Sequence, residues 1–138
     1  MITSGLTTSF KKELMLGVHN LETDVLKMAL YTSTADLGPD TAAYTDTGES
    51  SGTGYTEGGE ILLNVTVDAG QRTGFASFDN PTWLGSSLTA RGALIYNSSK
   101  SNKSIAVINF GTDQTTLAQA FNVVLPPDTP ESAAIRIS

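Results

Sequence analysis

The stretch Gly48-Glu49-Ser50-Ser51-Gly52 fits the pattern G-x-S-x-G, which in serine hydrolases places the nucleophilic serine on a sharp turn. That chemistry needs a strand before the turn, a helix after it, and an acid and a histidine later in the chain. The residues before this motif have the composition of a loop, and further glycines at 54, 58 and 59 exclude a helix after it. The single histidine, His19, precedes Ser50. Although convergent triads occur in any chain order, this context predicts a glycine-rich loop rather than a nucleophile.

Few other residues offer catalytic or metal chemistry. The chain has no cysteine, and a zinc or copper site around His19 would need carboxylates for nearly all its ligands, so we expect a surface or helix-end histidine. Asp40, Asp46 and Glu49 are hard oxygen ligands, but their spacing does not resemble a calcium-binding EF-hand. Carboxylates in glycine- and proline-rich segments are not held at the fixed separation that glycoside hydrolysis requires. We therefore predict a protein that is not an enzyme, with no catalytic residue, metal ligand or cofactor.

Composition restricts the remaining classes. A chain of 138 residues suits one domain, and its net charge of -6 repels phosphate backbones, so we expect no nucleic-acid partner. We also expect no membrane partner, because no apolar run is long enough to cross a bilayer and the N-terminus does not resemble a secretory signal. Charged residues make up only 16% of the chain, below the ~25% usual in soluble domains. A weakly charged surface is covered by a partner at lower desolvation cost, which favours an interaction protein.

One segment near the N-terminus predicts a helix. Ser9 is a plausible N-cap, Phe10 and Leu14 lie one turn apart on the same face, and Gly17 suits the position just after the last turn. A helix of about two turns is not stable alone, so it must pack against the rest of the fold.

Strand patterns dominate the rest of the chain. Residues 25–32 form a short apolar run, and residues 61–68 alternate, with Ile61, Leu63, Val65 and Val67 on one face. Two hairpins are predicted, with turns at residues 69–72 and 98–103, and Phe121, Val123 and Leu125 share a face of a later strand. The pattern predicts an all-β fold, an antiparallel β-sandwich or jelly-roll-like barrel with one short N-terminal helix. We expect a single domain over residues 1–138, with an N-terminal arm (about 1–9) and a C-terminal extension (about 126–138) that ends in a further short strand or an arm.

The remaining candidates for a binding surface are aromatic residues and apolar residues near the termini that have no evident place in such a core. Trp83 stands beside apolar strands and is expected in the core or at its rim, although an exposed row of Trp83 and tyrosines would indicate a sugar-binding face. Two tyrosines flank the glycine-rich loop, and four apolar residues lie near the termini. The resulting candidate protein-interface residues are Ile2, Leu6, Tyr44, Tyr55, Ile135 and Ile137.

Several longer strings resemble a family of small virion structural proteins of tailed bacteriophages. The resemblance runs from about Phe10 to Phe110 and more loosely to Leu125, and it includes "FKKELMLGVHNLETDVLKMALYTSTADLG" and "PTWLGSSLTARGALIYNSSKSNKSIAVINFG". It is most specific in "YTDTGESSGTGY" and "ARGALIYN". It implies a capsid cement or decoration protein, which binds the outer surface of the major capsid protein lattice and stabilises the expanded head. The tail after Leu125 departs from the family pattern.

The expected partners follow from this resemblance. They are the major capsid protein and further copies of the chain in a homodimer or homotrimer, since both suit symmetry axes of an icosahedral shell. The protein would be made in the host cytoplasm and located on the capsid surface of the virion. The alternative is a tail- or fibre-associated host-recognition module that binds glycans.

Overall fold

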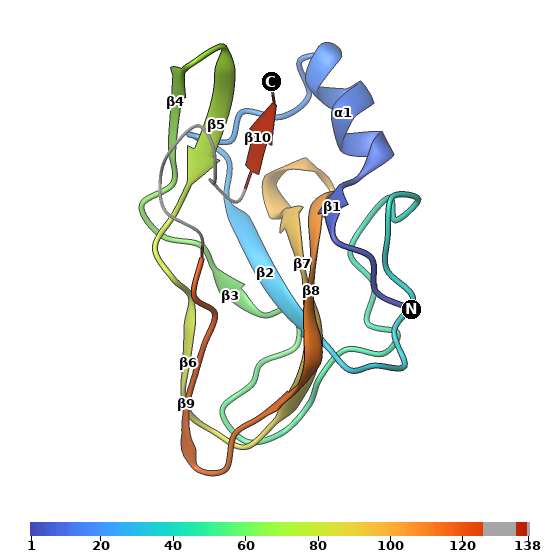
Figure 1. Ribbon diagram of the computed structural model, residues 1–138, viewed down its shortest axis with the longest axis vertical. Coiled ribbons are helices and arrows are strands. Elements are labelled where there is room, and N and C mark those ends of the chain that lie inside the picture. The colour runs from blue at the N-terminus through green and yellow to red at the C-terminus, as the bar shows by residue number, and fades with distance from the viewer. Residues whose placement is uncertain (126–134, 138) are drawn as a thin grey trace.

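Ten strands and one α-helix make up the part of the chain that the computed structural model describes, residues 1–125 and 135–137 (Figure 1). Every pairing between these strands is antiparallel, which confirms the predicted all-β fold with one short N-terminal helix. In chain order the elements are β1 Gly5–Leu6, α1 Thr8–Met15, β2 Leu26–Tyr31, β3 Glu60–Ile61, β4 Thr66–Gly70, β5 Thr73–Ser77, β6 Thr82–Ser86, β7 Thr89–Asn97, the 3₁₀ turn η1 Ser98–Lys100, β8 Lys103–Thr115, β9 Gln119–Asn122 and β10 Ile135–Ile137.

The larger sheet has the strand order β1-β8-β7-β2-β3. In β2, Met28 and Leu30 point to one face while Ala29 and Tyr31 point to the other, and all four are buried. The continuous apolar run of residues 25–32 thus predicts its strand correctly, and it lacks polar alternation because both faces of the sheet are covered.

A second layer covers one face of this sheet. It consists of the three-stranded sheet β10-β5-β4, the two-stranded sheet β6-β9 and the helix α1 (Figure 1). Trp83 from β6, Phe121 from β9 and Phe10 from α1 pack with the strands of the larger sheet into the main core. The structure is therefore a sandwich, the first of the two predicted alternatives, and it places Trp83 in the core.

The N-terminal segment and the chain after β2 cover the opposite face. Ile2 forms a bridge with Leu37, and both pack against Tyr31, Leu94 and Val107 in a second buried cluster. The residues that we predicted to form an N-terminal arm are therefore packed on their own chain, as β1 beside β8 and as the start of α1. The predicted C-terminal extension lies mostly outside the described residues.

The helix begins two residues earlier than predicted. Its N-cap is Thr7, whose Oγ1 accepts a hydrogen bond from the Phe10 backbone N–H at 3.3 Å, so the choice of Ser9 was wrong. Thr7 stands three residues before Phe10, which is the spacing that an N-cap hydroxyl needs to reach a free N–H. Gly17 follows the helix with φ +72°, and its N–H donates to the Leu14 carbonyl, which confirms the predicted termination.

Both predicted hairpins are present. Gln71 and Arg72 form the two-residue turn between β4 and β5, with φ of 50° and 65°. β7 and β8 pair along most of their length and are joined through η1.

The predicted alternating strand over residues 61–68 is wrong. The chain breaks at Asn64, whose φ is 55°, and passes from the larger sheet as β3 to the three-stranded sheet as β4. The buried residue of this segment is Leu62, whereas Ile61, Leu63 and Val67 are exposed. Val65 is partly buried against the main core, so the four alternating residues do not share one face.

Replacing Gly59 tests the close packing of the glycine-rich loop against β2. This glycine has φ +81°, and a Cβ there would lie 1.8 Å from the Met28 carbonyl oxygen. Gly59→Ala should lower the free energy of unfolding by about 3 kcal/mol or more, through backbone strain and displacement of the loop. Urea denaturation measures this change. Gly74→Ala is the control, because a Cβ there meets no atom within 4 Å, and equal stability of the two variants would contradict the packing.

Candidate functional site

The carboxylate of Glu49 organises the glycine-rich loop. Its Oε1 accepts a hydrogen bond from the Tyr44 hydroxyl at 2.6 Å, and its Oε2 accepts one from the Tyr55 hydroxyl. The Gly58 backbone N–H also donates to Oε2, at 2.8 Å. Glu49 thus joins three points of the loop and is not free to bind a metal ion or to act as a base.

The other two tyrosines of the chain complete this cluster. The Tyr31 hydroxyl donates to the Thr45 carbonyl at 2.6 Å, and the Tyr96 hydroxyl donates to the Gly58 carbonyl at 2.6 Å. The rings of Tyr44 and Tyr96 lie 4.9 Å apart between centroids. All four tyrosines therefore bind the loop to the larger sheet, and we call them the tyrosine cluster.

Burial is the first cause of high pKa values in the tyrosine cluster. It raises the pKa of Tyr96 to about 12, with a contribution from the charge of Glu49. Burial and the hydrogen bonds to Glu49 raise the pKa of Tyr44 and Tyr55 well above the usual range of tyrosine. Burial and the Glu49 charge do the same for Tyr31. The cluster is stable only while its hydroxyls keep their protons.

Ser50 is a structural residue of the loop. It is 3% exposed, and its backbone N–H donates to the Leu30 carbonyl at 2.8 Å. Its Oγ donates to the Thr89 carbonyl at 2.7 Å, and no histidine is among its hydrogen-bond partners. A hydroxyl held in this way has neither a base to activate it nor access to a substrate.

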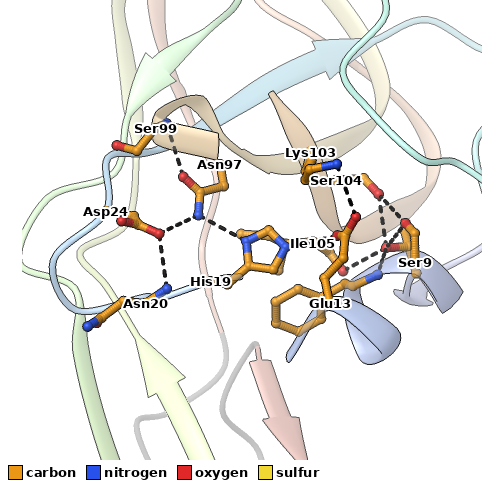
Figure 2. A network of polar contacts seen from close by, with 12 residues as sticks. Ser9, Glu13, His19, Asn20, Asp24, Asn97, Ser99, Lys103, Ser104 and Ile105 are labelled. Carbon is orange, nitrogen blue, oxygen red and sulfur yellow. Dashed lines mark hydrogen bonds and ion pairs between the residues drawn. The ribbon is translucent and has the colours of Figure 1, made fainter. Parts of the chain in front are cut away.

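His19 lies in a network that joins α1, the following loop and the β7–β8 hairpin (Figure 2). Its side chain is fully buried and lies in the loop after α1, so the expected surface position is wrong. Its Nε2 lies 2.9 Å from Glu13 Oε1, and its Nδ1 lies 3.0 Å from Asn97 Nδ2. Glu13 also pairs with Lys103, at 3.4 Å.

The orientation of Asn97 determines the tautomer of this histidine. Asn97 Oδ1 accepts from the Ser99 N–H at 3.0 Å, while Nδ2 donates both to His19 and to Asp24, the latter at 2.8 Å. His19 Nδ1 is therefore an acceptor, and Nε2 carries the proton that Glu13 accepts. Burial opposes ionisation of Asp24, but hydrogen bonds from Asn20 and Asn97 hold its pKa below the usual value. Both ring nitrogens are engaged, which leaves none for a metal or a substrate.

The structure separates the six candidate interface residues. The expectation that Ile2 and Ile135 have no place in the core is wrong: they are 6% and 3% exposed, and Ile135 is fixed by pairing of β10 with β5. The hydroxyls of Tyr44 and Tyr55 are directed at Glu49 of the same chain. Leu6 and Ile137 are less buried than Ile2 and Ile135, and each lines a groove.

Two grooves open beside the second layer. The first, about 640 Å³, lies between β8 and β9 and is lined by Leu6, Ile108, Phe110 and Phe121. The second, about 600 Å³, lies between α1 and β10 and is lined by Phe10, Leu14, Ala76, Ile135, Arg136 and Ile137. We call these the β8–β9 groove and the α1–β10 groove.

The sequence analysis missed the main exposed apolar residues. Leu84 on β6 is 76% exposed, Val124 just after β9 is 80% exposed, and Met15 at the end of α1 is 84% exposed. The expected core position of Trp83 could have indicated Leu84, since successive residues of a strand face opposite sides. An exposed row of Trp83 and tyrosines is not present, because Trp83 is buried and each tyrosine hydroxyl bonds within the chain.

The chain matches no protein-family model, no curated protein and no solved structure. Within residues 1–125 and 135–137, no three or more histidine, aspartate and glutamate side chains are grouped to hold a metal ion. The same residues contain no helix of the length and apolarity that crossing a membrane requires. The described site is thus a set of grooves and exposed apolar residues on a fold whose reactive groups are used internally.

Ser50→Ala tests the structural role of the loop serine. Loss of the bond to the Thr89 carbonyl should lower the free energy of unfolding by about 1 kcal/mol. The exposed neighbour Ser51 provides the control Ser51→Ala, which should leave stability unchanged. A fluorophosphonate probe should label neither the unchanged protein nor the variants, and labelling that disappears with Ser50→Ala would contradict the structural role.

The tyrosine cluster predicts a specific alkaline transition. Raised pKa values contribute stability that is complete below the ordinary tyrosine pKa of 10.0 and is lost as the pH approaches the folded value, about 12 for Tyr96. Tyrosinate absorbance and loss of the β circular-dichroism signal should therefore rise together above pH 10. Glu49→Gln should destabilise the protein by about 2 kcal/mol, whereas Glu60→Gln, at an exposed position, should not. Tyrosinate formation at pH 10 in a still-folded protein would contradict the cluster.

Proposed function

We propose that this chain is a non-enzymatic structural protein of a bacteriophage virion that cements the capsid. It binds the outer surface of the major capsid protein lattice as a homo-oligomer and stabilises the expanded head. The observation that carries the proposal is a division of roles among side chains. The groups able to do chemistry, Ser50, His19 and Glu49, are used within the fold, while large apolar side chains are left on the surface.

The rigidity of the fold suits a protein that holds neighbouring shell subunits together. Both faces of the larger sheet are buried, and the loops are fixed by side-chain hydrogen bonds such as those of Glu49 and Asn97. A rigid protein loses little conformational freedom when it binds, so more of the contact energy is available to hold neighbouring shell subunits together.

The exposed apolar residues provide surfaces for such contacts. Leu84 stands on β6 and Val124 follows β9, and Ile61 and Leu63 are exposed on and just after the short strand β3. In the described part of the chain β3 is an edge strand, so its outer backbone groups have no strand partner. An unpaired edge next to apolar side chains favours pairing with another chain, and we assign the β3 edge to self-association.

Binding to capsids tests the cement function. Purified protein added to expanded capsids that lack decoration should bind at saturation with a fixed ratio to the shell subunit. Bound protein should raise the capsid melting temperature, because a ligand of the assembled state stabilises it. Sedimentation and calorimetry measure the two effects, with unexpanded shells as the control lattice. Absence of binding, with recovery of the protein in the tail fraction of disrupted virions, would overturn the proposal.

A further inference from the structure

The α1–β10 groove combines an apolar floor with a free strand edge. Phe10 and Leu14 of α1 line one side, and Ile135 and Ile137 of β10 line the other. β10 pairs with β5 along one edge, and no other described strand lies on its second edge. In Figure 1, β10 lies between β5 and α1, so this second edge faces the groove. An extended polypeptide in the groove could therefore pair with β10.

The segments around the groove carry more cations than carboxylates, although the whole chain is acidic. Exposed cations stand on α1 (Lys11, Lys12), on the β4–β5 turn (Arg72) and on β10 (Arg136), which itself lines the groove, and these segments lie at the same end of the molecule (Figure 1). Lys11 lies one helical turn from Leu14, so its side chain is next to the groove wall.

Within residues 1–125 and 135–137, these four cations differ from most other basic side chains of the protein. None of them forms an ion pair with a described carboxylate, whereas Arg91, Lys100 and Lys103 do, at 3.3, 3.8 and 3.4 Å. On the described segments around the groove, the carboxylates that form no ion pair are Asp68 and Glu22, which lines the groove, so the four cations outnumber them.

Exposed apolar side chains extend the groove onto the surface. Met15 and Leu16 at the end of α1 are 84% and 68% exposed, and Val67 and Ile137 are 47% and 48% exposed. A partner must therefore supply both apolar groups and negative charge. An anionic lipid surface has both, but it would leave the backbone N–H and C=O groups of the β10 edge unpaired.

We propose that the α1–β10 groove binds an extended acidic segment of a partner protein. The segment adds a strand to β10, places alternate apolar side chains against Phe10 and Leu14, and sets its carboxylates beside Lys11 and Arg136. The inference rests on the proposed function only for the identity of the partner, which is a subunit of the capsid shell.

A peptide probe tests the groove independently of capsids. The probe is a short fluorescent peptide that alternates Glu with Ile or Val, and the control peptide has Lys in place of Glu. The acidic peptide should bind, and its binding should weaken as salt rises, because salt screens charge pairs. Amide resonances of residues 10–14 and 135–137 should shift on binding.

Paired charge reversals locate the binding. Lys11→Glu with Arg136→Glu should weaken binding of the acidic peptide about tenfold or more. Lys27→Glu with Arg91→Glu changes the net charge equally but lies away from the groove, and it should weaken binding by less than about twofold. Thermal unfolding verifies that both variants fold. If the Lys11→Glu, Arg136→Glu variant does not fold, the milder Lys11→Gln with Arg136→Gln replaces it.

The possible results separate the groove from the cement function. No binding of the acidic peptide, equal binding of both peptides, equal loss in both variants, or binding only to phosphatidylserine vesicles would each overturn the inference. If capsids bind the unchanged protein and the Lys11/Arg136 variant equally, the cement function stands and the inference fails. If the unchanged protein binds the acidic peptide but no capsid, the inference stands and the cement function fails.

Discussion

The buried contact between Glu49 and the tyrosines is the interaction on which the structure depends most. The larger sheet needs cover on both faces, and on one of them that cover is irregular chain rather than helix or strand. Irregular chain brings backbone groups that need hydrogen-bond partners when they are buried. Glu49 and the tyrosine hydroxyls supply those partners across the sheet face, and loop glycines allow the chain to approach the strands closely. Closing this face allows β2 and β7 to be apolar along nearly their whole length.

Local patterns in the sequence were enough to predict the architecture. The apolar run of β2, the two hairpins and the glycine that ends α1 are short-range signals, and each leads to the correct element. Prediction failed where distant segments decide the outcome. The alternation of residues 61–68 has the period of a strand, but the left-handed conformation of Asn64 moves the chain from one sheet to another, which exposes Ile61 and Leu63 while Val65 packs on the core. Ile2 lacked a predicted place because its site is created by Leu37 and Tyr31.

The candidate site was harder to predict than the fold for the same reason. The residues with catalytic chemistry were visible in the sequence, but their partners were not. The Thr89 carbonyl that holds Ser50 and the Asn97 amide that fixes His19 come from other strands. The grooves arise between segments, such as α1 and β10, that stand at opposite ends of the sequence. Leu6 and Ile137 were found because apolar residues near the termini are easily noticed, while Leu84 was overlooked although its neighbour Trp83 was expected in the core.

The two faces of the larger sheet are covered in different ways, so the two sides of the molecule have different surfaces. The N-terminal segment and the irregular chain after β2 cover one face, whereas the second layer on the other is built of two small sheets and a helix with the two larger grooves beside them. A molecule that attaches through its grooved side would present the other side outward each time. An ordered array of such molecules would therefore expose one uniform, firmly hydrogen-bonded surface to its surroundings.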